Sequence, residues 1–147
     1  MLLNNILIIC VGNICRSPMA EGLLKQALVG ANRTDCQVSS AGLGALIGHQ
    51  ADASACQLMT RKGIDISGHR ARQLNNEMIR EASLVLVMEL NQKTTIIENV
   101  QSTRGKVYRL GEWGSFDIAD PYGQKFVAFE EALVSIEQGI SQWIEKL

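Results

Sequence analysis

Residues 6–18 of this chain, ILIICVGNICRSP, place a cysteine and an arginine six positions apart, directly after a short apolar run. Cys10 is a candidate nucleophile, and Arg16 carries a planar fork of donors that can hold two oxygens of a phosphoryl group at once. Gly12 lies between them and is expected to let the backbone curl, so that successive N–H groups point inward and bind an anion. The pattern predicts a phosphate-binding loop that carries its own nucleophile.

A strand and a helix are expected to position this loop. Residues 5–10 form a short apolar run of the kind found in a parallel strand buried on both faces. Ser17 followed by Pro18 predicts a helix start, with serine as the N-cap and proline at the first helical position. The free N–H groups and the macrodipole at a helix N-terminus favour both a bound anion and the thiolate form of Cys10. The hydroxyl of Ser17 can donate to that sulfur.

The cysteine and arginine spacing is weak support when taken alone, because a match of this kind arises easily by chance. A buried cysteine that ends a strand is also commonly an inert, small apolar residue. The coincidence of the strand, Gly12, Arg16 and the Ser-Pro pair in one register favours the phosphate-binding interpretation.

Four segments extend the pattern along the chain: CVGNICRSPMAE at 10–21, SSAG at 39–42, GHRARQ at 68–73 and DPY at 120–122. With them the chain resembles, nearly from end to end, the low-molecular-weight protein tyrosine phosphatase family. The resemblance implies three catalytic residues, namely Cys10 as nucleophile, Arg16 as phosphate clamp and Asp120 as general acid. It also implies substrate-binding positions at Val11, Gly12, Asn13, Ile14, Cys15, Ser17 and Tyr122, and a supporting hydrogen-bond network of Asn13, Ser17, Ser40 and His69.

The expected reaction is a double displacement through a phosphocysteine. The phenolate leaving group needs a proton, and Pro121 restricts Asp120 to an extended conformation that fixes the direction of its carboxyl group. Asp117 is the competing carboxyl, and an Asp-Pro pair is also an ordinary turn signal. No cofactor and no metal are expected, because the loop and Arg16 already compensate the phosphate charge. The acid must be protonated while the thiol is ionised, which predicts an optimum on the acidic side of neutrality.

Two side chains bear on the choice of substrate. An apolar rim at Ile14 and an aromatic wall at Tyr122 suit a flat phenyl ring, which favours phosphotyrosine. Relatives that resemble protein-arginine phosphatases carry threonine where this chain has Ile14. Many members of the family have a second aromatic residue after DPY, whereas this chain has Gly123. Trp113 and Phe116 are candidates to supply that surface or, alternatively, to cover the core.

Other functions remain as alternatives at this stage. A thioredoxin-coupled arsenate reductase has the same fold and phosphate loop, but it needs two further cysteines, and residues 82–99 contain none. A catalytically silent phosphotyrosine-binding module would lack the nucleophile or the acid, and both are present.

Cys15 could form a reversible disulfide with Cys10, or it could pack behind the loop. A zinc site is disfavoured, because no C-x2-C pair exists and the two histidines, His49 and His69, lack ligand spacing.

Composition agrees with a single domain over residues 1–147. The chain has a net charge of −1, which gives no reason to expect nucleic acid or an anionic membrane surface as a partner. The N-terminal apolar stretch is too short for a signal peptide or a membrane span, so a cytoplasmic protein with four cysteine thiols is expected. It is expected to be a monomer.

Apolar runs alternate with helical patterns. Strands are predicted at 5–10, 36–41, 83–88 and 106–110, and helices at 18–29, 52–62, 75–81, 90–100 and 125–146. The alternation predicts an α/β fold, a four-stranded parallel sheet with helices on both faces, and the phosphate loop between the first strand and the first helix at the carboxyl ends of the strands. The last helix is expected to bury a stripe of Phe126, Phe129, Leu133, Ile136, Ile140 and Trp143.

The segment AGLGALIG at 41–48 points to a subgroup of the family. It resembles the bacterial phosphatases that act on tyrosine autokinases controlling capsule and exopolysaccharide export. This resemblance implies that the protein partner is the tyrosine-rich tail of a membrane-bound tyrosine autokinase.

Overall fold

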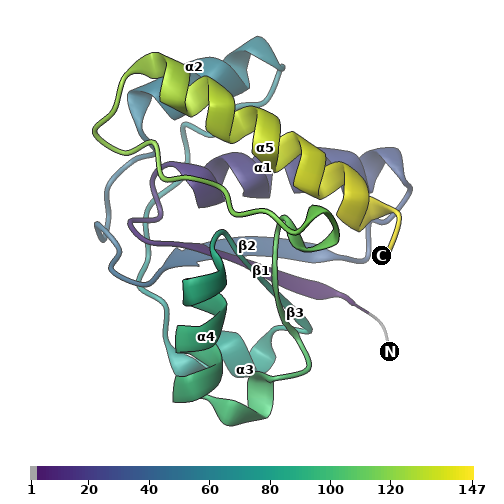
Figure 1. Ribbon diagram of the computed structural model, residues 1–147. Coiled ribbons are helices and arrows are strands. Elements are labelled where there is room, and N and C mark those ends of the chain that lie inside the picture. Colours follow the sequence, from purple (N-terminus) through teal and green to yellow (C-terminus); the bar gives the residue numbers. More distant parts are fainter. Residues whose placement is uncertain (1–2) are drawn as a thin grey trace.

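The computed structural model describes residues 3–147 and contains a four-stranded sheet in which every neighbouring pair is parallel (Figure 1). The strands run in the spatial order β2-β1-β3-β4. Their bounds are β1 (Asn5–Cys10), β2 (Gln37–Gly42), β3 (Leu84–Val87) and β4 (Val107–Arg109). The predicted α/β class and parallel sheet are confirmed, and β1 lies at the centre of the sheet with Cys10 at its carboxyl end.

Helices cover both faces of the sheet, as predicted. One face carries α1 (Arg16–Gly30), α2 (Ala53–Arg61) and α5 (Phe126–Ile144), and the other carries α3 (Asn76–Glu81) and α4 (Leu90–Asn99) (Figure 1). Two short 3₁₀ helices, η1 (Gln101–Thr103) and η2 (Glu112–Gly114), flank β4. None of the helices within residues 3–147 combines the length and the apolar character that a membrane span requires.

The apolar run of β1 is explained by burial on both faces. Successive side chains of a strand point in opposite directions, so Ile6 and Ile8 face the α1 and α5 layer, while Leu7 and Ile9 face the α3 and α4 layer. The stripe predicted for α5 packs on the first of these faces. Phe129, Leu133, Ile136, Ile140 and Trp143 are buried, and Phe126 is half-buried.

The start of α1 differs from the prediction. The helix begins at Arg16 and its N-cap is Cys15, which makes no side-chain capping bond. Ser17 and Pro18 therefore lie inside the first turn, and the prediction of Ser17 as N-cap was wrong. The Ser17 hydroxyl instead lies against Cys10. Pro18 is tolerated because the first N–H groups of a helix have no partner within the helix.

Gly139 allows α5 to approach the end of β4 closely. A Cβ atom at this position would lie 2.7 Å from the carbonyl oxygen of Leu110, whereas a Cβ at Gly30, near the end of α1, would meet nothing within 4 Å. We predict that Gly139→Ala lowers the free energy of unfolding by about 1–3 kcal/mol, because α5 or the segment after β4 has to shift. The matched variant Gly30→Ala should be neutral or more stable by up to about 1 kcal/mol. Urea unfolding measures both, and equal stability of the two variants would contradict this packing.

Candidate active site

The loop from Cys10 to Arg16 joins β1 to α1 and surrounds a small cavity. Cys10 is the last residue of β1, and its Sγ lies 2.9 Å from the Oγ of Ser17. The cavity has a volume of about 150 Å³, roughly that of a few water molecules. It is lined by Cys10, Val11, Gly12, Ile14, Cys15, Arg16, Gly44, Leu46, Asp120 and Tyr122. Eight of the ten predicted catalytic and substrate-binding residues therefore line the cavity, and the other two, Asn13 and Ser17, do not.

Asn13 gives the loop its curl. Its φ of 59° lies in the left-handed region. Its side chain is fully buried: Nδ2 donates to the Oγ atoms of Ser17 (2.7 Å) and Ser40 (3.0 Å), and Oδ1 accepts from the backbone N of Arg72 (2.9 Å). The prediction that Gly12 provides the curl was wrong, because φ of Gly12 is not left-handed and an added Cβ would meet only ordinary contacts of 3.8 Å or more.

A second layer of contacts holds this network in place. The Nε2 of His69 lies 2.6 Å from the carbonyl oxygen of Asn13. The Oγ of Ser40 donates to Oε1 of Glu21 at 2.7 Å, and Nε of Arg72 donates to the carbonyl oxygen of Ser40 at 2.8 Å. The structure thus brings together the four residues that the family resemblance implied. Sequence reasoning assigned no role to Glu21 and Arg72, although both stand inside quoted motifs.

The guanidinium of Arg16 is held from one side and is 1% exposed. Its Nη1 donates to the carbonyl oxygen of Ile118 at 2.7 Å and lies 3.3 Å from Oε1 of Glu89. Its Nη2 lies 3.6 Å from Oδ2 of Asp120, and its buried Nε has no hydrogen-bond partner among residues 3–147. Two protein oxygens therefore fix the direction of the fork, while Nε remains a buried donor for an anion. The roles of Glu89 and Ile118 were not predicted, and neither residue belongs to a quoted motif.

The two candidate carboxyl groups occupy different places. Asp120 lines the cavity, and its Oδ1 accepts from the backbone N of Tyr122 at 3.1 Å. Asp117 does not line the cavity. Its Oδ1 accepts from the backbone N of Leu90 at 3.1 Å and from Nη1 of Arg109 at 3.0 Å. Asp117 therefore connects the segment that carries Asp120 to the start of α4 and to β4.

The cavity contains a second cysteine, Cys15, with a different environment. Burial raises the pKa of the Cys15 thiol, and the carboxylate of Asp52 raises it further. Because the thiolate is the reactive form, Cys15 remains a poor nucleophile beside Cys10. All four cysteines are free thiols, and a regulatory disulfide between Cys10 and Cys15 stays a prediction.

The predicted aromatic surface lies elsewhere. Trp113 and Phe116 do not line the cavity: Trp113 stacks edge-on against Trp143, and Phe116 packs beside Gly111. Leu46 and Gly44 line the cavity instead. Both belong to the segment 41–48, which sequence reasoning used only to choose a subgroup.

The described residues offer no candidate metal centre. Within residues 3–147, no three side chains of the His, Cys, Asp or Glu type are grouped so that they could hold a metal ion. His69 is engaged with the loop backbone, and His49 is exposed.

Comparisons with known proteins agree with this geometry. A family model described as low molecular weight phosphotyrosine protein phosphatase matches residues 5–147. A protein of Ralstonia nicotianae named "Probable low molecular weight protein-tyrosine-phosphatase EpsP" is 48% identical over 146 residues, which are 99% of this chain and 97% of that protein.

Two solved structures are informative. Vibrio vulnificus Wzb in complex with benzylphosphonate superposes with a TM-score of 0.92 at 36% identity, covering 99% of this chain and 100% of the other. The YwlE arginine phosphatase of Geobacillus stearothermophilus superposes with a TM-score of 0.87 at 35% identity, covering 97% and 92%. The match over nearly the whole chain confirms the predicted resemblance, and the chain belongs to the low molecular weight phosphotyrosine protein phosphatase family.

Proposed function

We propose that this chain hydrolyses phosphotyrosine in proteins through a phosphocysteine on Cys10. The observation that carries the proposal is the buried fork of Arg16, whose Nε has no partner within residues 3–147, on a cavity shared with Cys10 and Asp120. An anionic phosphate at this place would satisfy the orphaned donor. The nearby thiol and carboxyl group supply a nucleophile and a proton donor for phosphoryl transfer.

In the first step, the Cys10 thiolate attacks phosphorus and a sulfur–phosphorus bond forms. The bond between phosphorus and the phenolic oxygen breaks, and Asp120 gives its proton to that oxygen as tyrosine leaves. Arg16 holds the equatorial oxygens, and the free N–H groups at the start of α1 stabilise the charge that collects on them.

In the second step, Asp120 accepts a proton from water while the water oxygen attacks phosphorus. The sulfur–phosphorus bond breaks and phosphate is released. The hydroxyl of Ser17, 2.9 Å from Sγ, stabilises the departing thiolate by hydrogen bonding. The high pKa of the Cys15 thiol keeps it protonated and out of both steps.

The walls of the cavity support tyrosine over arginine as the phosphorylated residue. Ile14 and Leu46 present apolar side chains, and Tyr122 presents an aromatic one, all of which suit a phenyl ring. None of the three offers a charged partner to a guanidinium group. Arsenate reduction is not favoured, because the relatives are phosphatases and residues 82–99 contain no cysteine.

The cellular setting is a further part of the proposal. The relatives EpsP and Wzb support a place in exopolysaccharide control, and we propose the tyrosine-rich tail of a membrane-bound tyrosine autokinase as the substrate there. The four free thiols support action in the cytoplasm, where thiols stay reduced, and we propose that the chain acts there as a monomer.

The general acid can be assigned by comparing two carboxyl groups. We predict that Asp120→Asn lowers kcat on a phosphotyrosine peptide by about 10²–10⁴-fold, because the phenolate then leaves without a proton. Asp117→Asn should change kcat little, since Asp117 bonds Leu90 and Arg109 instead of facing the cavity. With p-nitrophenyl phosphate, whose leaving group needs less protonation, the loss in Asp120→Asn should shrink. A larger loss in Asp117→Asn than in Asp120→Asn would contradict the assignment.

The proposed function is tested with three peptides of one sequence that carry phosphotyrosine, phosphoarginine or phosphoserine. We expect phosphate release from the phosphotyrosine peptide at a kcat/KM at least about tenfold above the others, because the apolar walls bind the phenyl ring in the transition state. Cys10→Ser is the control and should abolish release. Preference for the phosphoarginine peptide would make the chain an arginine phosphatase, and no release from any peptide would refute hydrolysis.

A further inference from the structure

A second, larger hollow lies at the opposite end of the sheet from Cys10. It has a volume of about 690 Å³, a size typical of binding sites for small ligands and peptide side chains. It opens where the strands begin: Leu3 precedes β1, Leu84 starts β3 and Lys106 precedes β4. We call this hollow the β4 groove. It is lined by Leu3, Ala82, Ser83, Leu84, Ser102, Gly105, Lys106, Tyr108, Trp113, Trp143 and Lys146.

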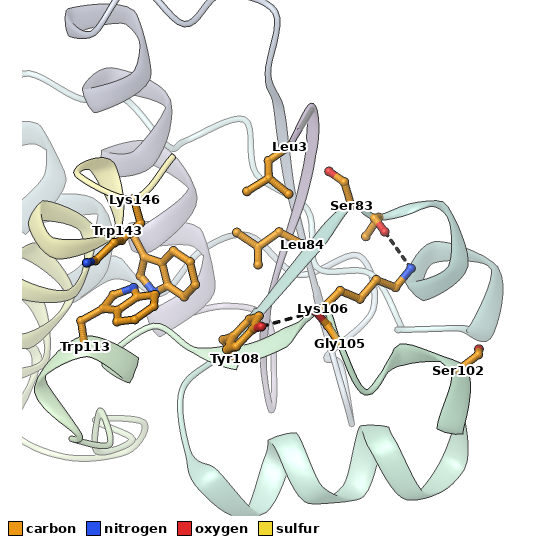
Figure 2. A pocket seen from close by; sticks show the side chains of 11 residues that line it. Leu3, Ser83, Leu84, Ser102, Gly105, Lys106, Tyr108, Trp113, Trp143 and Lys146 are labelled. Carbon is orange, nitrogen blue, oxygen red and sulfur yellow. Dashed lines mark hydrogen bonds between the residues drawn. The ribbon is translucent and has the colours of Figure 1, made fainter. Parts of the chain in front are cut away.

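Three aromatic side chains from separate elements converge on one end of the β4 groove, as Figure 2 shows. Tyr108 of β4 and Trp113 of η2 both meet Trp143 of α5 edge-on, with ring centroids 5.6 Å and 5.3 Å apart. Trp143 is buried and fixed by a bond from Nε1 to the carbonyl oxygen of Arg109, whereas Trp113 is 46% exposed. An apolar or aromatic side chain could therefore stack on preformed rings.

The charged side chains that line the β4 groove within residues 3–147 are both positive. Lys146 places its Nζ 4.7 Å from the ring centroid of Trp113, at the aromatic end. Lys106 lies toward the other end (Figure 2). It donates to the carbonyl oxygens of Ala82 (2.7 Å) and Arg80 (3.2 Å), which leaves one of its three N–H groups for a ligand. Within residues 3–147, no aspartate or glutamate lines the groove.

The carboxylate of Glu112, next to Trp113 in the chain, does not cancel this charge. Its Oε1 lies 3.5 Å from Nζ of Lys93 and accepts from the backbone N of Arg109 at 3.2 Å. Lys106 and Lys146 are the charged residues that line the groove within residues 3–147, and in a protein of net charge −1 this favours negative charge in whatever binds there.

We propose that the β4 groove docks an acidic segment of a protein partner, with an aromatic side chain of that segment stacked among Tyr108, Trp113 and Trp143 and its carboxylates near Lys106 and Lys146. Rigid aromatic anchors and a rim of matching charge are the features that make a peptide-binding surface specific. Because the groove and Cys10 lie at opposite ends of β1, a docked segment leaves the catalytic cavity open. The proposal stands independently of the proposed phosphatase activity.

The two tryptophans of the chain are both in the β4 groove, so intrinsic tryptophan fluorescence reports on this site directly. The probe is a capped peptide with one phenylalanine between two pairs of glutamates, which contains no tryptophan or tyrosine. We expect a saturable change in emission that weakens as salt is added. At constant ionic strength it should persist in excess inorganic phosphate, which occupies the other cavity. Peptides with lysines for glutamates, or alanine for phenylalanine, should bind at least about fivefold more weakly.

Two lysine variants provide the matched controls. Lys146→Gln should weaken binding about fivefold, the scale of one exposed charge, while Lys62→Gln should leave it unchanged because Lys62 pairs with Glu137 away from the groove. Neither variant should alter turnover of p-nitrophenyl phosphate. An equal response to the lysine peptide, loss of the signal in phosphate at constant ionic strength, or no signal would overturn the proposal. Concentration-dependent self-association without a peptide response would assign the groove to a second copy of the chain.

Discussion

The left-handed backbone of Asn13 is the constraint on which the rest of the site depends. A residue other than glycine in this conformation carries a strain cost, and here a fully buried amide that bonds Ser17, Ser40 and the backbone of Arg72 offsets it. These partners come from three segments that are distant in the sequence. The curl of the phosphate loop is therefore a property of the assembled fold, and each partner lost would leave a buried polar group unsatisfied.

The parallel sheet brings those partners together. In the register of β1 with β2, Ile8 lies beside Ser40, so the serine stands near the loop that follows Cys10. On the other side of β1, the chain after β3 contributes Glu89, and the chain after β4 contributes Ile118, to hold Arg16. Glu89 is itself fixed, because its backbone N donates to the side chain of Gln92 in α4. The carboxyl ends of three adjacent strands thus supply the nucleophile and the supports of the phosphate clamp.

The sequence was sufficient where local pattern and burial agree. The apolar run of β1 and the stripe of α5 required only strand and helix periodicity, and both were predicted correctly. Predictions from local sequence pattern were wrong where contacts with other parts of the chain determine the conformation. Asn13 adopts the left-handed conformation in place of Gly12 because its amide has partners in α1, in β2 and in the loop at Arg72. Ser17 is not the N-cap, and its hydroxyl faces Cys10 and Asn13 instead.

Tertiary contacts were also needed to assign different roles to residues of the same type. The Asp-Pro pair and the family resemblance favoured Asp120 over Asp117, and the partners in the structure show the difference directly: Asp117 bonds Arg109, while Asp120 lines the cavity. In the same way, Trp113 reads from the sequence as a possible cavity wall, whereas packing against Trp143 places it in the β4 groove.

The central claim is that Cys10 accepts the phosphoryl group within a loop held by Asn13. Its most direct test is to mix the protein with a phosphotyrosine peptide, quench in acid during turnover and locate phosphate on the chain by fragmentation mass spectrometry. We expect a phosphocysteine at Cys10 that forms and decays with product release, with Cys15 unmodified. Phosphate on Cys15, or turnover without any phosphoenzyme, would contradict it.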